Sequence, residues 1–369
     1  MPLKILHTSD VHLGMKFASY PDVQLKLSEA RYETLGKLVK LANSERCELF
    51  VIAGDLFHLT SVAKGQIHKA TEILKEFNGK LIVILPGNHD FLTGDRADTW
   101  GILKDKAGDN LLLLEKKEVY DLRRYDLDVH MYPAPCDSKH SEINYIGWIK
   151  DVQKDNNVKY HIGIAHGSLE GFSPDFDKKY YPMSVQELRE CGIDLWLMGH
   201  THIHYPEKPG ERDIIFYPST PEPDGFDCVH EGGTWIIDID DDKKIRPQLR
   251  TTGNYRFLHD EVTVNEASDL ERLKTKYASG YSKTLLKLKL RGRLPKEEYN
   301  SLSDLKKYLE SQLFYLQFDN EIAEKVTLDD INRTFTEGSF PHMLLTKLAE
   351  NNEIEALQIA HDLLVEQKQ

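Results

Sequence analysis

Short runs of aliphatic residues alternate with longer amphipathic stretches in the first part of the chain, and this alternation limits the fold most strongly. Residues 3–7, 49–53 and 81–85 have the length and apolar character of strands that are buried on both faces. Residues 24–42 and 64–77 between them have the apolar spacing of helices. This order predicts a sheet covered by helices on both faces, and therefore an α/β fold. In the first helix, the apolar side is predicted to consist of Leu25, Leu35, Leu38, Val39 and Leu41.

The pattern changes after about residue 112, where shorter strands are separated by loops. These strands are predicted at residues 129–132, 161–165, 195–198, 214–217 and 235–239, and they indicate a second sheet of mixed direction. A Gly-Asn turn near residues 251–255 precedes a further strand at 284–291 and a helix at 300–314. We therefore predict a main domain over residues 1–250, a small α/β domain over 251–335 and a helical tail over 336–369.

Five of the predicted strands end in clusters of polar residues. Ligands of open α/β sheets bind at the carboxyl ends of strands, so these clusters are expected to converge on one place. The candidate ligands in them are Asp10, His12, Asp55, Asn88, His166, His200 and His202, with His89 as an eighth.

Carboxylate, amide and imidazole groups without a thiolate suit borderline-hard divalent ions such as Mn²⁺, Fe²⁺ or Zn²⁺. Seven ligands are too many for one tetrahedral ion, but they suit two ions about 3.5–4 Å apart that share a bridging carboxylate. Any one of these clusters alone is ordinary loop chemistry, because Asn and Asp favour turns. The five together indicate a dinuclear metal site.

The order of these motifs resembles that of the calcineurin-like metallophosphoesterase superfamily. In detail it is similar to the DNA-repair exonucleases of the SbcD and YhaO kind, which are related to the nuclease of the double-strand-break repair complex. The resemblance covers roughly residues 1–250. It implies a four-layer α/β (α+β) fold, a two-sheet β-sandwich flanked by helices, with a smaller C-terminal α/β cap domain. The motifs that carry it are Ser9-Asp10-Val11-His12, Gly54-Asp55-Leu56-Phe57-His58, Gly87-Asn88-His89-Asp90, Ala165-His166-Gly167 and Gly199-His200-Thr201-His202.

The resemblance also implies how the ligands are shared between two ions. The first ion would be held by Asp10, His12, Asp55 and His202, and the second by Asp55, Asn88, His166 and His200. The implied ions are most often Mn²⁺, with Fe²⁺, Zn²⁺ or Mg²⁺ as alternatives.

Three further residues match positions near the reacting phosphate in the family. His89 corresponds to the histidine that contacts the scissile phosphate and protonates the leaving oxygen, and Asp90 is expected to orient its imidazole. His58 corresponds to a second histidine of the nuclease branch. The implied activity is that of a DNA exonuclease with some endonuclease activity.

Other members of the superfamily share the core motifs, so a phosphatase or a small-molecule or cyclic-nucleotide phosphodiesterase is the alternative. Phosphatases typically carry an Asp-Arg pair after the Gly-Asp loop, whereas the run from Gly54 to Thr60 contains no arginine, and this favours the nuclease branch. A non-catalytic DNA-repair scaffold would have lost ligands, and all seven are present. One departure is Tyr217-Pro218-Ser219-Thr220-Pro221, where relatives often have a glycine turn.

The charge of the chain argues against broad electrostatic binding of nucleic acid, because 60 acidic residues outnumber 47 basic ones and the net charge is −13. A local basic row is nevertheless predicted on one face of a strand, where Lys287, Lys289 and Arg291 alternate with leucines. Such a row could lie along a DNA backbone. The alternative is an edge strand protected from aggregation by lysines.

The last predicted helix carries an apolar stripe that packs on its own domain or binds a partner. The stripe consists of Ile354, Leu357, Ala360, Leu363 and Leu364. The resemblance implies an SMC-like ABC ATPase partner and a homodimer through the helix at residues 24–42. The N-terminus lacks a signal-peptide pattern, no apolar run approaches the roughly 18 residues of a membrane span, and the four cysteines show no CxxC spacing. We therefore expect a cytoplasmic protein without a membrane partner.

Overall fold

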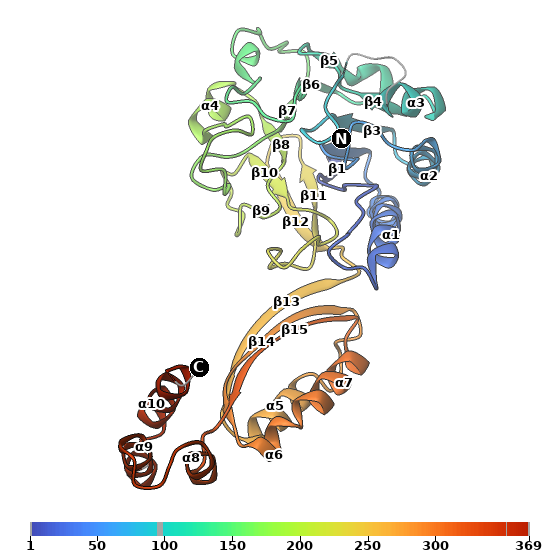
Figure 1. The fold of residues 1–369 in the computed structure, drawn as a ribbon. Helices are drawn as coiled ribbons and strands as arrows, with labels where there is room; N and C mark the ends of the chain where they lie inside the picture. Colours follow the sequence, from blue (N-terminus) through green and yellow to red (C-terminus); the bar gives the residue numbers. More distant parts are fainter. Residues whose placement is uncertain (1, 94–98, 352, 368–369) are drawn as a thin grey trace. The chain divides into compact units, whose positions relative to one another are not determined.

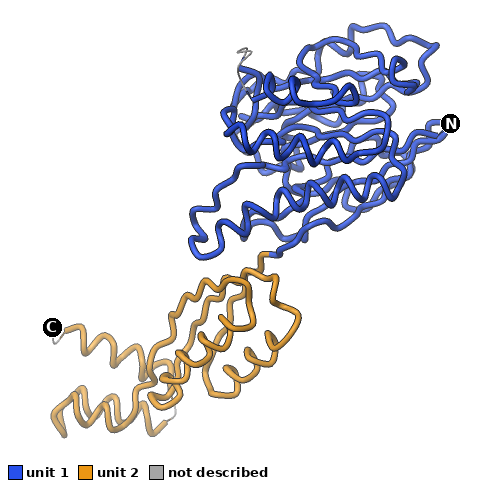
Figure 2. The backbone as a smooth tube through the Cα atoms, turned by 90° about the vertical axis from the view of Figure 1, so that its right-hand side faces the viewer, with its two compact units in different colours: residues 1–256 blue, residues 257–369 orange. Residues whose placement is uncertain are grey.

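The computed structural model describes residues 2–93, 99–351 and 353–367 of the 369-residue chain. The chain forms two compact units, residues 1–256 and residues 257–369 (Figure 2). None of the described helices is both long and apolar enough to span a membrane.

The first unit contains two six-stranded sheets (Figure 1). The first sheet has the order β12-β11-β1-β2-β3-β4, in which β1 to β4 are parallel and β11 and β12 are antiparallel to their neighbours. Its strands are β1 (Leu3–Thr8), β2 (Leu49–Ala53), β3 (Leu81–Leu85), β4 (Leu111–Leu113), β11 (Gly233–Ile239) and β12 (Ile245–Thr251).

The second sheet has the order β5-β6-β7-β8-β10-β9. The four central strands are parallel, whereas β5 and β9 at the edges are antiparallel, so the predicted mixed direction is confirmed. The assignment of residues 235–239 to this sheet is wrong, because they lie in β11, which pairs with β1 in the first sheet. Its strands are β5 (Tyr120–Asp121), β6 (Val129–Ala134), β7 (Tyr160–His166), β8 (Leu195–Gly199), β9 (His204–Tyr205) and β10 (Ile215–Pro218).

The two sheets face each other across an apolar layer, because alternate residues of each strand point to opposite faces. Val51 and Val83 belong to this layer, whereas Phe50 and Ile82 pack with the helices on the outer face of the first sheet. Those helices are α1 (Gln24–Ser44), α2 (Lys64–Lys75) and α3 (Thr99–Lys106). The outer face of the second sheet is covered by α4 (Val185–Glu190) and long loops. The predicted two-sheet sandwich flanked by helices is therefore confirmed.

Helix α1 differs in one respect from the prediction. Leu35, Leu38 and Val39 are fully buried, but Leu25 is 80% exposed. At 3.6 residues per turn, Leu25 falls outside the stripe that these three residues form with Leu27. The expectation that Leu25 packs on the sheet is therefore wrong.

The second unit is a three-stranded sheet with helices on one face. The sheet has the order β13-β14-β15, and β14 and β15 are parallel. Its strands are β13 (Arg256–Val264), β14 (Thr284–Leu294) and β15 (Tyr315–Glu324). Leucines of β14 pack against α5 (Ala267–Lys276) and α7 (Leu302–Gln312), and the short α6 (Lys296–Tyr299) precedes α7.

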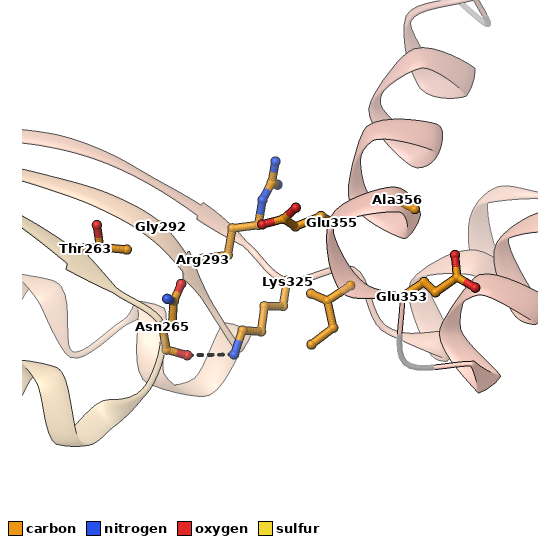
Figure 3. A pocket seen from close by; sticks show the side chains of 9 residues that line it. Thr263, Asn265, Gly292, Arg293, Lys325, Glu353, Glu355 and Ala356 are labelled. Carbon is orange, nitrogen blue, oxygen red and sulfur yellow. Dashed lines mark hydrogen bonds between the residues drawn. The ribbon is translucent and has the colours of Figure 1, made fainter.

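Three helices complete this unit: α8 (Leu328–Thr334), α9 (Phe340–Glu350) and α10 (Ile354–Glu366). The stripe predicted on α10 is divided between the core and the surface. Leu357 is buried in a cluster with residues of α8 and α9, whereas Ile354 and Leu363 are 50% and 57% exposed. Residues of this sheet and of α10 line a cavity of about 870 Å³ (Figure 3). At its edge the Lys325 ammonium donates a hydrogen bond to the Asn265 carbonyl, with an N···O distance of 2.6 Å.

Candidate metal centre

The loops at the carboxyl ends of five strands meet at one edge of the sandwich. β1, β2 and β3 are parallel neighbours in the first sheet, as β7 and β8 are in the second, so each set ends at a common edge. The two edges touch: His166 Nδ1 lies 2.8 Å from the Ala53 carbonyl, and the His200 backbone N–H donates to Asp10 Oδ2 at 3.0 Å. The structure thus brings together Asp10, His12, Asp55, Asn88, His166, His200 and His202.

Four of these side chains surround a first subsite. His12 Nε2 lies 3.3 Å from His202 Nε2 and 3.7 Å from Asp55 Oδ2. Asp10 Oδ1 lies 3.5 Å from His202 Nε2 and 3.9 Å from His12 Nε2. Ligand atoms about 2.0–2.2 Å from one ion are separated by about 3–3.6 Å. The four atoms therefore have nearly the spacing of the ligands of one divalent ion.

A second subsite lies on the other side of Asp55. Asn88 Oδ1 is 3.0 Å from His166 Nε2 and 3.1 Å from His200 Nδ1, and Asp55 Oδ2 is 3.4 Å from His166 Nε2. The same Oδ2 atom of Asp55 thus faces both subsites, while its Oδ1 accepts the backbone N–H of His89 at 2.9 Å. This is the arrangement of a carboxylate that bridges two ions.

Buried charge at the site fits cationic ligands. Asp10 and Asp55 are almost completely buried. Burial raises the pKa of Asp10, but the nearby imidazoles of His202 and His166 lower it to about 2. The pKa of Asp55 is lowered further by His166, against the effect of burial. Asp10 Oδ1 has no hydrogen-bond donor among the described residues, and a buried anionic oxygen of this kind requires a cation.

The ligand histidines direct ring nitrogen atoms toward the subsites. His166 Nδ1 is held by the Ala53 carbonyl and His202 Nδ1 by the Asp224 carboxylate at 3.1 Å, which leaves Nε2 of each ring for an ion. Burial lowers the pKa of His12 to about 3, and burial with the charge of His166 lowers that of His200 to about 4. Against the effect of burial, Asp55 raises the pKa of His166 to about 9 and Asp224 raises that of His202 well above its usual value, so an ion has to displace a proton from these two rings. Neutral imidazoles are the form that binds metal.

The backbone is strained where the ligands converge. Of eleven non-glycine residues with a positive φ in the described part of the chain, four are candidate ligands: Asp10, His12, Asp55 and His200. Such strain is concentrated at functional sites. Gly54 has a φ of +93°, and a Cβ atom there would lie 1.9 Å from His166 Nδ1, so only glycine allows this close approach.

Two further predicted residues lie beside the subsites. The half-buried His89 stacks on the ring of His58 with centroids 5.1 Å apart, and its Nδ1 lies 3.2 Å from the His58 carbonyl oxygen. Its ring is 4.8 Å from that of His12. His89 also lines a cavity of about 380 Å³ together with Asn88 and His202. The side chain can therefore contact a group that is bound at the metal centre.

Asp90 does not orient the His89 imidazole, so that expectation is wrong. Its carboxylate accepts the backbone N–H groups of Gly87 at 2.7 Å and Phe57 at 2.9 Å, and it is fully buried. Burial and the charge of Asp55 raise the pKa of Asp90 to about 8. Asp90 thus ties the loop after β2 to the loop after β3, while the His58 carbonyl takes the expected role at His89.

Sequence reasoning missed four side chains around the subsites. Asp224 holds His202, Arg31 lies within 3.5 Å of Asp224, and Tyr180 packs on the His200 ring with centroids 4.8 Å apart. His230 Nε2 is 2.6 Å from the carbonyl of His202. Pro223-Asp224-Gly225 signals only a turn. Arg31 could have been found from the sequence, because it is a charged residue on the apolar stripe of a helix and therefore needs a buried partner.

The turn after β10 lacks the glycine that relatives often have, but it keeps a glycine-like backbone. Ser219 has a φ of +70°, in the left-handed region. The next residue, Thr220, donates its hydroxyl to the Asp10 carbonyl at 2.9 Å. The departure in sequence therefore leaves this turn in contact with the ligand loop.

The predicted basic row lies in the second unit, on the central strand β14, so the edge-strand alternative is wrong. Lys289 pairs with Glu321 at 2.5 Å, and Arg291 pairs with Glu261 and Glu321. Among the described residues, Lys287 has no carboxylate within ion-pair distance. The charge of the row is therefore partly neutralised by the neighbouring strands.

A two-sheet sandwich with two ligand sets that share one carboxylate defines a metal-dependent phosphoesterase. The profile of the calcineurin-like phosphoesterase family matches residues 3–204, and the chain belongs to this family. Phosphoesterases of this family use a dinuclear divalent metal site, and the described His and Asp clusters are able to bind metal.

Similar proteins agree with the DNA-repair branch of the family. The chain is 23% identical over 249 residues to the uncharacterized metallophosphoesterase YhaO of Bacillus subtilis, covering 64% of this chain and 57% of that protein. It is 26% identical over 236 residues to the DNA double-strand break repair protein Mre11 of Methanopyrus kandleri, covering 60% and 49%. The Mre11 protein of Saccharolobus solfataricus is 23% identical over 354 residues, covering 90% and 86%. The chain thus spans about half the length of the first two relatives, and the predicted resemblance is confirmed.

Proposed function

We propose that this phosphoesterase hydrolyses phosphodiester bonds of DNA, as an exonuclease with some endonuclease activity in DNA repair. The observation that carries the proposal is the His58–His89 stack beside the two subsites, at the place where phosphatases of the superfamily have an Asp-Arg pair. Relatives named as double-strand break repair proteins support DNA as the substrate.

Each group at the site then has a chemical task. Divalent ions in the subsites would neutralise the phosphate and lower the pKa of the attacking water. The Nδ1–H group of His89 donates to the His58 carbonyl, which leaves Nε2 to contact the phosphate and protonate the leaving sugar oxygen. His58 supports this ring by stacking, and Asp90 holds the two loops on which His58 and His89 lie.

The native ion in this proposal is Mn²⁺, with Fe²⁺, Zn²⁺ or Mg²⁺ as alternatives. Two carboxylates, one amide and four imidazoles form a mixed oxygen and nitrogen set without thiolate, which supports a borderline-hard ion.

DNA would be positioned in part by Lys287, Lys289 and Arg291. Lys287 is the strongest candidate, because its ammonium has no carboxylate partner in the described structure. Phosphates would have to compete with Glu321 for the other two side chains. Contacts of this kind fix position rather than sequence.

Protein partners are part of the same proposal. An SMC-like ABC ATPase would bind the helices α8 to α10, which expose Phe340 (70%), Met343 (57%) and Ile359 (59%). A homodimer would form through α1, where Leu25 is 80% exposed. Large exposed apolar side chains that gather in one region are typical of interaction surfaces. We also propose a cytoplasmic location, which the four unpaired, buried cysteines support.

The alternative is a phosphatase or a small-molecule or cyclic-nucleotide phosphodiesterase. The cavity that His89 lines has a volume of about 380 Å³, which is large enough for a compact ligand. This cavity therefore supports a compact phosphate ester as the alternative substrate.

The test uses metal-stripped protein supplied with Mn²⁺. End-labelled single- and double-stranded DNA, a chromogenic phosphomonoester and a chromogenic phosphodiester are offered to the wild type and to the Asp55→Ala and His89→Gln variants. We expect Mn²⁺-dependent DNA degradation that is lost in Asp55→Ala and falls about 10²- to 10⁴-fold in His89→Gln. His68→Gln, an exposed histidine of α2, is the matched control. Rapid phosphomonoester turnover with intact DNA would contradict the nuclease and favour a phosphatase.

A further inference from the structure

We propose that Arg31 and Asp224 form a positioning pair that sets the affinity of the first metal subsite and leaves the second subsite unaffected. The inference rests on the ligand assignment in the proposed function. It concerns two residues that touch neither ion nor substrate in that assignment.

Asp224 fixes the ring of His202. Its Oδ2 atom lies 3.1 Å from His202 Nδ1, so the carboxylate accepts a hydrogen bond from Nδ1–H and directs Nε2 toward the first subsite. Its Oδ1 atom accepts a hydrogen bond from the Cys228 thiol at 3.1 Å. These two contacts fix the carboxylate of Asp224 beside the ring of His202.

Arg31 links Asp224 to the loop that carries Asp10 and His12, the two ligands of the first subsite besides His202 and the shared Asp55. The fully buried Arg31 donates from Nη1 to the Val11 carbonyl at 2.8 Å, and its Nη2 atom lies 3.5 Å from Asp224 Oδ2. Val11 stands between Asp10 and His12. The Nε and Nη2 atoms of Arg31 have no hydrogen-bond partner among the described residues. One guanidinium from α1 thus contacts the loop of Asp10 and His12 and the carboxylate that holds His202.

The second subsite has separate support. His166 is held by the Ala53 carbonyl, and the Asn88 amide donates to the Lys139 carbonyl at 3.3 Å. Both partners are backbone groups. Neither Arg31 nor Asp224 makes a described hydrogen bond or ion pair with these side chains. A change at the positioning pair should therefore weaken one ion and not the other.

The expected loss of affinity at the first subsite can be estimated from other metal sites. Loss of a partner that orients a metal-binding histidine typically lowers metal affinity about 10- to 100-fold. Asp224→Asn keeps the shape of the side chain and an oxygen acceptor but removes the charge. Arg31→Lys keeps the charge but cannot reach both the Val11 carbonyl and Asp224 in the same way. Each variant tests one half of the pair.

The experiment measures Mn²⁺ binding to the full-length protein by calorimetry, together with the electron paramagnetic resonance signal of the bound ions. The wild type should bind two ions that give the signal of a spin-coupled pair. In Asp224→Asn and Arg31→Lys, one ion should bind about 10- to 100-fold more weakly and the other unchanged. At intermediate Mn²⁺ the signal should be that of an isolated ion, and excess Mn²⁺ should restore both the coupled signal and hydrolysis of a chromogenic phosphodiester.

Glu222→Gln provides the matched control. Glu222 is a buried carboxyl of the same loop, but it bonds to Thr34 and Asn254 rather than to a ligand. This variant should bind both ions as the wild type does. Melting temperatures of the metal-free variants identify any that fail to fold. If Arg31→Lys or Asp224→Asn does not fold, the other variant still tests the inference.

Three outcomes would overturn the inference. Wild-type affinity for both ions in the two variants would show that the pair does not position the subsite, while the proposed function would stand. Equal weakening of both ions would indicate a general structural role. A wild-type protein that binds fewer than two ions would refute the ligand assignment, and the inference with it.

Discussion

A Gly54→Ala substitution should remove His166 from the second subsite by adding a single methyl group. The new Cβ atom would lie 1.9 Å from Nδ1 and 2.4 Å from Cγ of His166. Real Cβ atoms do not approach other atoms so closely, so the imidazole has to move. Its Nδ1 then loses the Ala53 carbonyl at 2.8 Å, and its Nε2 moves away from Asn88 and Asp55.

The loss of stability can be estimated from two contributions. Alanine at a φ of +93° costs about 1–3 kcal/mol. A buried Ala53 carbonyl left without its donor costs about 1–3 kcal/mol more. The free energy of unfolding of the metal-free protein should therefore fall by about 2–6 kcal/mol. This is a large part of the about 5–15 kcal/mol that stabilises a typical domain.

Urea unfolding of the metal-free protein and Mn²⁺ stoichiometry test this prediction together. We expect the lower stability and a change from two bound ions to one, with loss of phosphodiester hydrolysis. Gly65→Ala is the matched control, because Gly65 lies in α2 with no atom within 4 Å of its added Cβ, and the variant should gain about 0.5–1 kcal/mol. A Gly54→Ala protein with two ions and wild-type stability would refute the position of His166 described above.

Three other perturbations have defined outcomes. Burial lowers the pKa of His7 to about 3, so below about pH 6.5 the unfolded chain binds a proton at His7 that the folded protein does not. The free energy of unfolding of the metal-free protein should therefore fall by about 2 kcal/mol between pH 7.5 and pH 5 because of His7. In urea unfolding, the free energy of unfolding of His7→Gln should fall by about 2 kcal/mol less than that of the wild type over the same pH range. Mn²⁺ at about 100 times its dissociation constant should add about 2.7 kcal/mol per subsite, and EDTA should reverse the rise in melting temperature; an unchanged melting temperature would contradict metal binding. Lys287→Glu should weaken DNA binding and lower the magnitude of its salt dependence by about 1 in log–log slope, while hydrolysis of a chromogenic phosphodiester stays unchanged; equal losses on both substrates would contradict a DNA contact.

Much of the first unit could be predicted because its central strands are buried on both faces. The residues of β2 and β3 were predicted without error, since an unbroken apolar run of five residues bounded by polar loops allows few other structures. The convergence of Asp10, Asp55 and Asn88 follows from the parallel order of their strands.

Other features depend on information that the linear sequence does not contain. The opposite directions of His89 and Asp90 are set by the backbone of one tight turn, so a motif match could not show that Asp90 faces the protein interior. Arg31 and Asp224 are 193 positions apart, and although Arg31 is conspicuous as a charge on the apolar stripe of α1, Asp224 has an ordinary interpretation as a turn residue. Their contact exists only because α1 and the loop after β10 pack beside the same edge.

The division of the ligands between the two sheets has a consequence for how the sheets are held together. Asp10, Asp55 and Asn88 follow strands of the first sheet, whereas His166 ends β7 and His200 follows β8 in the second. Ions in the proposed subsites would therefore cross-link the two sheets and add to the His–Asp contacts that already join them. The metal supply of a cell would then set both the activity of this enzyme and how firmly its two sheets are held together.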